Sequence, residues 1–480
     1  MKAPRVVSVF LILVLLAIST DLRAGMALES YDITVPDDYS SIQEAIDAAS
    51  PNHFILVRSG IYTEYIVINK TIHLFGEDKS TTVIEGNGTK VLIQVLANNV
   101  TLSGFSLKNA GTGILLHDVK NCLVKGNMIT NFGIFDGGLS SGIGVFVDNC
   151  ENITLIENFA SDFYYHAIKF FNTDKSYIGK NVFIATMRWS QALFLHVSDC
   201  NVISWNDVLG LAGMNEGGIG LLRSNNNTIS YNNIFENDWA GISVRLSNYT
   251  IVKGNNIANH SWWGMILRMS HNVSIYLNNF IDNAMQLLVE SVENVSWYHD
   301  GYGNFWSDYT GRDNNNDGIG ETPYLDNGEE IDLYPLVGKS SFWELSRDDE
   351  RFLVEIISNS TIISAVYSPS FTSNGTIILE TSGQIGTWGF IIMKLPHSLM
   401  QKPYNVTING QNPLLLKELA TSQDFTMLYF AYLHESEQEI IMVIQEFLFI
   451  PLILMLASIL MIIKTVLKKI GFFGSLKRTE

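Results

Sequence analysis

One polar loop carries oxygen atoms at the spacing of a metal-binding turn. The segment 312–324 reads R-D-N-N-N-D-G-I-G-E-T-P-Y. Its oxygen-bearing groups are the side chains of Asp313, Asn315, Asp317 and Glu321 and the backbone carbonyl of Ile319. Ca²⁺ takes six to eight oxygens in a tight loop, and glycine at the sixth position, here Gly318, lets the chain reverse. The spacing predicts a structural Ca²⁺ site.

The same loop departs from the pattern of an EF-hand. Its twelfth position is Tyr324, so the bidentate glutamate is missing. Asp326 or Asp332 would have to replace that ligand through a fold-back of the chain. The alternative interpretation is an asparagine-rich turn without an ion. In either case the predicted role of the loop is structural.

Two tryptophans and two arginines recur at one interval. The spacing from Trp239 to Trp262 equals the spacing from Arg245 to Arg268, and Trp263 follows the second tryptophan. Aromatic faces beside guanidinium groups suit sugar rings and uronate carboxylates. These five residues are predicted to bind a polysaccharide or envelope glycan. The alternative is that the aromatic rings only pack at the corners of a repeat fold.

The acids and bases form no recognisable catalytic motif. Glycoside hydrolysis needs two carboxylates about 5 to 9 Å apart, and Glu216 with Asp238 is one candidate pair if neighbouring coils hold them. A lyase needs a base beside a cation, and His166 with Lys169 is the candidate there. No catalytic residue is assigned. A polysaccharide lyase, hydrolase or epimerase stays open beside the binding interpretation.

An internal repeat supplies the elements that position these residues. The segments N-N-T-I-S-Y-N-N-I, I-V-K-G-N-N-I and V-S-I-Y-L-N-N-F end at equal intervals, at Ile234, Ile257 and Phe280. The same apolar position continues backwards through Val208, Val182, Phe159, Met128 and Leu107. Short β-type runs at this period predict about ten stacked coils whose strands pair about 4.8 Å apart. Asparagine recurring at one turn predicts a side-chain ladder that satisfies buried backbone groups.

A short amphipathic helix is expected to close the first coil. The segment D-Y-S-S-I-Q-E-A-I-D-A-A-S places Ser40 and Gln43 at the spacing of a capping box. Ile42, Ala45 and Ile46 follow on one helical face. That face can cover the end of the solenoid and block edge-to-edge pairing.

These motifs together resemble a known family. V-P-D-D-Y-S-S-I-Q-E-A-I-D-A-A-S, I-H-L-F-G-E-D, the N-N-I coils and the final G-N-F-W-S-D-Y are similar to the NosD-like (CASH domain) branch of the pectin-lyase-like superfamily, as found in archaeal surface proteins. The resemblance implies a right-handed parallel β-helix over residues 28–338. It implies less about activity, because this fold hosts enzymes and inert adhesins alike. A copper association also comes with the family name, but the scattered residues His166, His196 and His260 do not support it.

The two ends and the C-terminal third predict an exported, anchored protein. Residues 1–27 read as a signal peptide, either cleaved or retained as an anchor. Residues 339–438 show alternating strands that suggest a small β-sandwich stalk. Residues 439–463 predict a transmembrane helix, and the basic residues 464–480 a cytoplasmic tail. The expected fold class is therefore all-β, a solenoid and a sandwich between two membrane-targeting segments, with the β domains extracellular.

Charge and cysteine content limit the partners. A net charge of −18 argues against nucleic acid, since phosphate binding needs clustered Lys and Arg. Cys122, Cys150 and Cys200 are an odd number in an exported chain and are interpreted as small core residues. Sequons from Asn69 to Asn405 are compatible with a glycoprotein. The sequence thus predicts a cell-surface β-helix protein that binds glycans, with an enzyme or a purely structural envelope component as alternatives.

Overall fold

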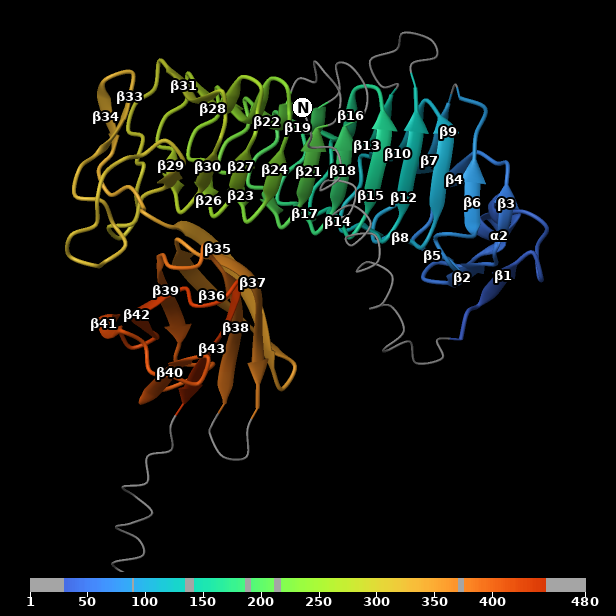
Figure 1. Ribbon diagram of the computed structural model, residues 1–480. Helices are drawn as coiled ribbons and strands as arrows, with labels where there is room; N and C mark the ends of the chain where they lie inside the picture. The colour runs from blue at the N-terminus through green and yellow to red at the C-terminus, as the bar shows by residue number, and fades with distance from the viewer. Residues whose placement is uncertain are drawn as a thin grey trace, which may run out of the picture. The chain divides into compact units, whose positions relative to one another are not determined.

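The computed structural model describes residues 30–88, 90–133, 142–185, 191–210, 217–369 and 375–445. They form an all-β solenoid of about 11 turns followed by a region of antiparallel sheets (Figure 1). The chain divides near residue 202 into two compact units. The predicted signal peptide lies outside the described residues, and the right-handed sense of the solenoid stays a prediction.

The first unit contains three parallel sheets, and each coil adds one strand to each sheet. Sheet A orders β1 (Ile33–Val35), β2 (Phe54–Val57), β5 (His73–Gly76), β8 (Thr101–Ser103), β11 (Leu123–Lys125), β14 (Thr154–Ile156) and β17 (Tyr177–Gly179). Sheet B orders β3 (Gly60–Tyr62), β6 (Thr82–Glu85), β9 (Ser106–Ala110), β12 (Met128–Phe132), β15 (Phe159–Phe163) and β18 (Val182–Ala185). Sheet C orders β4 (Ile66–Ile68), β7 (Val91–Val95), β10 (Thr112–His117), β13 (Ile143–Asp148), β16 (His166–Phe171) and β19 (Gln191–His196).

The second unit repeats the same coil. Its sheet A strands are β20 (Val202–Ser204), β23 (Thr228–Ser230), β26 (Ile251–Lys253) and β29 (Ser274–Tyr276). Its sheet B strands are β21 (Asp207–Gly210), β24 (Asn233–Phe235), β27 (Asn256–Ala258), β30 (Asn279–Ile281) and β32 (Phe305–Trp306). Its sheet C strands are β22 (Gly217–Leu222), β25 (Ala240–Arg245), β28 (Trp263–Arg268) and β31 (Met285–Glu290).

The predicted coil register is correct in the second unit and wrong by one residue in part of the first. Ile234 pairs with Ile257, and Ile257 with Phe280, as the repeat predicts. In the first unit the buried position instead runs through Ile129, Ala160 and Phe183. Met128, Phe159 and Val182 pair with one another but are only half-buried. Side chains alternate between the two faces of a strand, so a slip of one residue selects the outer face.

Helix α2 (Ile42–Ala48) covers the first coil, as predicted, but its cap is shifted by one residue. Ser41 is the N-cap and accepts the Glu44 N–H at 3.2 Å, so the predicted box of Ser40 and Gln43 is wrong. Gln43 has another role: its side chain accepts from the Val67 N–H at 2.8 Å and donates to the Val67 carbonyl at 3.2 Å. Val67 lies in β4, the terminal strand of sheet C, so the helix closes that exposed edge.

The predicted asparagine ladder is confirmed at the turn between sheets A and B. In the second unit Asn255 accepts two hydrogen bonds from Asn232, from its backbone N–H at 3.0 Å and its side-chain amide at 2.9 Å. The Asn255 amide in turn donates to Asn278 and to the Ile229 carbonyl, each at 2.9 Å. All these asparagines are buried, and so are the corresponding Asn127, Asn158 and Asn181 of the first unit. The ladder satisfies backbone groups that no water reaches.

A carboxylate ends this ladder at the last coil. Asp332, in β34 (Glu329–Asp332), accepts from the Asn304 N–H at 2.7 Å and from the Trp306 indole at 3.1 Å. Its side chain is fully buried, and β34 pairs with β33 (Tyr324–Asp326) in a short hairpin. The expectation that Asp332 could serve the oxygen-rich loop is therefore wrong, because its oxygens hold the ladder. The Trp306 ring stacks between Phe280 and Tyr324, with centroids 4.4 and 4.2 Å away, and covers the core.

Two antiparallel sheets share one core after residue 338. The first orders β35 (Lys339–Arg347), β36 (Glu350–Ser358), β39 (Trp388–Pro396), β42 (Phe425–Leu433) and β41 (Leu415–Thr421). The second orders β37 (Thr361–Ser368), β38 (Thr376–Ser382), β43 (Gln438–Gln445) and β40 (Tyr404–Ile408). Inward side chains of both sheets, among them Val354, Leu379, Phe430 and Val443, form one hydrophobic cluster. This arrangement is the predicted sandwich.

The end of the sandwich differs from the predicted boundary. Residues 439–445, expected to begin the membrane helix, lie in β43, where Ile441 and Val443 alternate inward. Among the helices within the described part of the chain, none has the length and hydrophobicity of a membrane-spanning segment. The remainder of the predicted helix and the basic tail lie outside the described residues.

The cysteines are free in the structure. Cys122 and Cys150 are buried, as predicted, and burial raises the pKa of the Cys150 thiol to about 11. Cys200 is exposed, so its interpretation as a core residue is wrong. It has a positive φ of 60° in the connection that precedes β20, which turns its side chain away from the core.

Candidate functional site

The three tryptophans form a contact cluster at the turn between sheets B and C. The ring centroids of Trp239 and Trp262 are 5.8 Å apart, and Trp263 lies 5.0 and 5.3 Å from them. The Trp263 N–H donates to the Trp239 carbonyl at 3.0 Å, which fixes the two coils in register. Trp239 and Trp262 are 41% and 49% exposed, so nearly half of each ring system remains open to solvent. We call these three residues the tryptophan cluster.

The two arginines do not join this cluster. Arg245 and Arg268 pair in register but end β25 and β28, whereas Trp263 begins β28. Five residue steps along a strand separate the two ends by roughly 16 Å. The Arg268 Nε also lies 2.7 Å from a carboxylate oxygen of Glu290. The structure therefore brings the predicted tryptophans together and places the predicted arginines at the next corner.

His260 belongs to the core. It lies at the turn between sheets B and C, in a position equivalent to that of the ladder asparagines at the turn between sheets A and B. Its Nδ1 accepts the Asn237 N–H at 3.0 Å. Burial lowers its pKa to about 4, so the ring is neutral at pH 7. Asp238, beside it, accepts from the Ser261 hydroxyl at 3.2 Å. Glu216, the proposed acidic partner of Asp238, lies outside the described residues.

The histidine of the candidate lyase pair is only a weak base. His166 stacks on Phe194 with centroids 5.3 Å apart, and burial, reinforced by Lys169, lowers the histidine pKa to about 3. The Lys169 ammonium lies 5.2 Å from the centre of the Phe146 ring. Both side chains thus pack against aromatic residues on the solenoid surface. No described contact prepares either of them for proton abstraction.

The oxygen-rich loop folds as a compact turn held by its own acids. The Asp313 carboxylate accepts the N–H groups of Asp317 at 3.2 Å and Gly318 at 2.8 Å. Glu321 accepts the Asn314 N–H at 2.8 Å, and Asn315 donates to Asp317 at 2.9 Å. Gly318 has a φ of +83°, the reversal expected at this position. In the described residues no group of three or more His, Cys, Asp or Glu side chains is arranged around a metal position, and the Ca²⁺ site stays a prediction.

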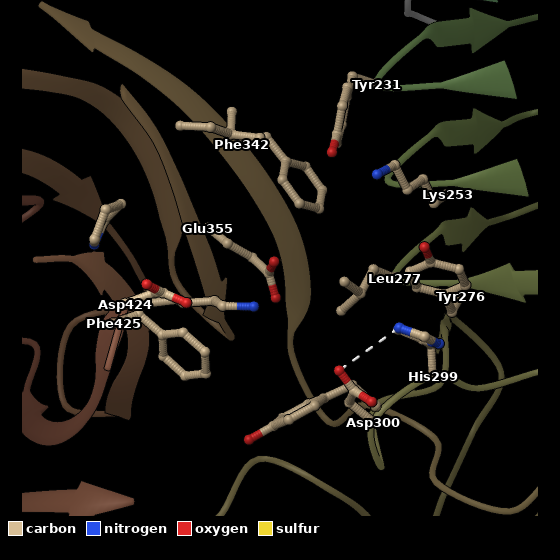
Figure 2. A pocket seen from close by; sticks show the side chains of 14 residues that line it. Tyr231, Lys253, Tyr276, Leu277, His299, Asp300, Phe342, Glu355, Asp424 and Phe425 are labelled. Carbon is tan, nitrogen blue, oxygen red and sulfur yellow. Dashed lines mark ion pairs between the residues drawn. The ribbon is translucent and has the colours of Figure 1, made fainter. Parts of the chain in front are cut away.

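A cavity that the sequence interpretation missed lies elsewhere in the second unit. Its volume is about 410 Å³, and Figure 2 shows side chains from the sheet A turns on one wall and from the sandwich on the other. We call it the junction cavity. A signal for one wall was present in the repeat: Ser230, Lys253 and Tyr276 are successive partners at the ends of β23, β26 and β29. The opposite wall comes from strands much later in the chain, so spacing alone does not reveal it.

The chain is similar to several known proteins. Residues 96–311 match the NosD family, described as a periplasmic copper-binding protein. A cell surface glycoprotein of Methanothermus fervidus is 33% identical over 124 residues, which cover 25% of this chain and 20% of that protein. The probable ABC transporter binding protein NosD of Stutzerimonas stutzeri is 42% identical over 64 residues, 12% of this chain and 14% of that protein. Among solved structures, the Dettilon tailspike protein has a TM-score of 0.44 at 13% identity and covers 82% of this chain and 87% of its own.

The family match supports the predicted NosD-like resemblance over residues 96–311. The chain spans a fifth or less of the length of the two relatives named by sequence. Three side chains of the ligand types that suit the copper of the family description are buried or engaged in other contacts. His260 is held in the core by Asn237, His166 stacks on Phe194, and Met265 is fully buried. Copper prefers clustered His, Met or Cys ligands. In the described part of the chain, no three His, Cys, Asp or Glu side chains are grouped around a metal position.

Proposed function

We propose that this is a cell-surface protein whose solenoid binds polysaccharide through the tryptophan cluster. The observation that carries the proposal is the half-exposed contact of Trp239, Trp262 and Trp263 on neighbouring coils. Exposed aromatic faces pack against the C–H faces of sugar rings, and rings repeated along the solenoid suit a chain of sugars. The surface location is supported by the similarity to a cell surface glycoprotein, and attachment through the residues that follow β43 is part of the proposal.

The test is retention of the purified full chain on immobilised acidic and neutral polysaccharides. Trp239→Ala and Trp262→Ala should each weaken retention about tenfold or more, the usual effect of removing a central aromatic contact. Trp388→Ala is the matched control, because Trp388 is 63% exposed in the sandwich, far from the cluster in sequence. Retention that survives both cluster substitutions would overturn the proposal. Release of new reducing or unsaturated sugar ends would favour an enzyme instead.

The oxygen-rich loop is proposed separately as a structural Ca²⁺ site. Support comes from its spacing and from the turn that already gathers Asp313, Asp317 and Gly318. Ca²⁺ should raise the thermal unfolding midpoint of the full chain, and a chelator should reverse the rise. Asp313→Ala should abolish the response to Ca²⁺, whereas Asp282→Ala, on the solenoid surface, should keep it. A wild-type midpoint that ignores Ca²⁺ would leave the asparagine-rich turn as the correct interpretation.

A further inference from the structure

The turn from sheet C to sheet A presents one exposed position that recurs from coil to coil. In the first unit this position lies two residues before β8, β11 and β14, and its residues are Asn99, Asn121 and Asn152. In the second unit it lies two residues before β23, β26 and β29, and its residues are Asn226, Tyr249 and Asn272. Each of them has a φ of 56° or 57° and is exposed. A positive φ favours asparagine, so backbone geometry accounts for the residue type.

Backbone geometry does not account for the hydroxyl group that follows two residues later. Four of these asparagines begin the sequence N-x-S/T, the acceptor pattern for N-linked sugars. In each case the asparagine is exposed, the next residue is buried, and the hydroxyl residue is half-buried at the start of a sheet A strand. The four pairs are Asn99 with Thr101, Asn152 with Thr154, Asn226 with Thr228, and Asn272 with Ser274. We call them the turn sequons; both groups of each lie on the solvent side of the turn.

Another sequon has the same sequence pattern but is shifted by one residue in the coil. The Asn248 side chain is half-buried, and its oxygen accepts the His271 N–H at 2.8 Å. Thr250, which supplies the hydroxyl of this sequon, is fully buried. Tyr249, between them, is 58% exposed. The fold therefore hides this sequon and displays the turn sequons, a distinction that the sequence pattern does not contain.

Within each unit one coil separates the two turn sequons. The intervening residue is Asn121 in the first unit and Tyr249 in the second, and neither begins a sequon. Two coil steps separate the sequon asparagines by roughly 10 Å, which leaves room for a bulky sugar on each. The contacts inside the turn also allow attachment. The Asn152 amide donates to Asn121 at 2.8 Å, and attachment replaces only one of its two N–H groups.

We propose that the four turn sequons carry N-linked glycans, which cover the turn between sheets C and A. In the attachment, a bond forms between the asparagine Nδ2 and C1 of the sugar, and the bond between C1 and the phosphate oxygen of a glycosyl phosphate donor breaks. The Nδ2 releases one proton, and the phosphate leaves with the electron pair of the broken bond. This turn is distinct from the turn between sheets B and C that carries the tryptophan cluster, so the inference does not rest on the proposed function.

Glycopeptide mass spectrometry of the full chain, isolated from the cells that produce it, tests this assignment. Trypsin cleaves after Arg245, so Asn226 and Asn248 fall in different peptides. We expect sugar on all four turn sequons and at least about tenfold lower occupancy at Asn248, because bulky glycans attach to surface asparagines. Thr228→Val should remove the sugar from Asn226 alone, since valine keeps the β-branched shape and lacks the hydroxyl.

Two further variants complete the test. Thr250→Val removes the hydroxyl of the hidden sequon and is the matched control, which should leave every glycan in place. Asn152→Gln should remove one glycan from the first unit, so it remains informative if Thr228→Val fails to fold. Unmodified peptides at all four turn sequons would overturn the proposal, because the asparagines would then serve the positive φ alone. Equal occupancy at Asn248 would also overturn it, since attachment would then ignore exposure in the folded chain.

Discussion

Two turns of the same coil differ in how much their length varies from one coil to the next. The turn from sheet A to sheet B has two residues in successive coils of the second unit: β23 ends at Ser230 and β24 begins at Asn233, and the next two coils repeat this connection. The turn from sheet B to sheet C is longer and varies in length. The insertions at 133–142, 186–190 and 211–216 all follow a sheet B strand and precede a sheet C strand.

The difference shows where the fold tolerates variation. The short turn contains the buried asparagine ladder, in which each amide completes the backbone hydrogen bonds of its neighbour. A change of length there would interrupt every rung. The longer turn also contains a short buried row, in which the Asn237 N–H donates to His260 and the His260 N–H donates to Asn283. Its half-exposed tryptophans lie outside that row and can contact a ligand. We therefore expect the two corners to separate stability from binding.

The largest effect should come from the ladder. Asn255→Ala removes the acceptor of two Asn232 hydrogen bonds and the side-chain donor of the Ile229 carbonyl, whereas the Asn278 oxygen keeps the backbone N–H of residue 255. Each buried group left unpaired costs roughly 1–3 kcal/mol, so we expect a loss of about 4 kcal/mol in the free energy of unfolding. Urea unfolding followed by circular dichroism measures this loss.

The adjacent asparagine is the matched control for that substitution. Asn256 also lies in a side-chain row, and its amide donates to Asn233 at 2.7 Å, but it is on the outer face and half-buried. Water can replace its lost hydrogen bonds, so Asn256→Ala should cost about 1 kcal/mol or less. Equal losses for Asn255→Ala and Asn256→Ala would show that the ladder has no special role.

A second effect should appear as a pH dependence at the end of the ladder. Burial raises the pKa of Asp332 from its usual 3.8 to about 6, so between these values the folded state binds more protons than the unfolded chain. Stability from this group is greatest at low pH and falls as the pH rises from about 4 to 6. Two pKa units correspond to about 3 kcal/mol. Asp332→Asn cannot ionise and should lack this dependence.

The measurement compares urea unfolding of the two proteins at pH 4 and pH 7. From pH 4 to pH 7, the free energy of unfolding of the wild type should fall by about 3 kcal/mol relative to that of Asp332→Asn. Asp326→Asn, in the same hairpin but only half-buried, is the control and should show a smaller change. Parallel pH profiles of wild type and Asp332→Asn would mean that folding does not raise the pKa of Asp332.

Repetition made most of the fold predictable. Where the interval between corresponding strands is constant, the register of Ile234, Ile257 and Phe280 is correct. Where the interval varies, the repeat assigns Met128 and Val182 to the wrong face. Each is followed by another apolar residue that fits the pattern equally well, and only packing decides which of the two is buried. The membrane prediction began too early for a related reason: β43 is an alternating apolar strand whose composition resembles the start of a helix.

The sites were less predictable because side chains from distant segments form them. The contact of Trp239 with Trp262 follows from the repeat. The separation of the arginines from the tryptophans does not follow from it. An equal interval shows that two residues stack on neighbouring coils, but it does not give the distance between one stacked pair and another. The junction cavity requires Lys253 from the solenoid and Glu355 from the sandwich, and no periodicity links these two residues.

The smallest effect on stability should come from the tryptophan cluster, and it decides whether the two corners differ as proposed. Trp239→Ala and Trp262→Ala remove side chains that are 41% and 49% exposed, so part of each ring already contacts water in the folded state. Burial of about half of a large side chain contributes about 1 kcal/mol, and an aromatic contact adds about 0.5–1.5 kcal/mol. We therefore expect each substitution to cost about 2 kcal/mol. The same urea experiment measures both variants beside Asn255→Ala. If loss of polysaccharide retention accompanies this small cost, the cluster is a binding surface on a corner that stability does not constrain. If either substitution destabilises the protein as much as Asn255→Ala, the rings are corner packing, and the contrast between the two turns is wrong.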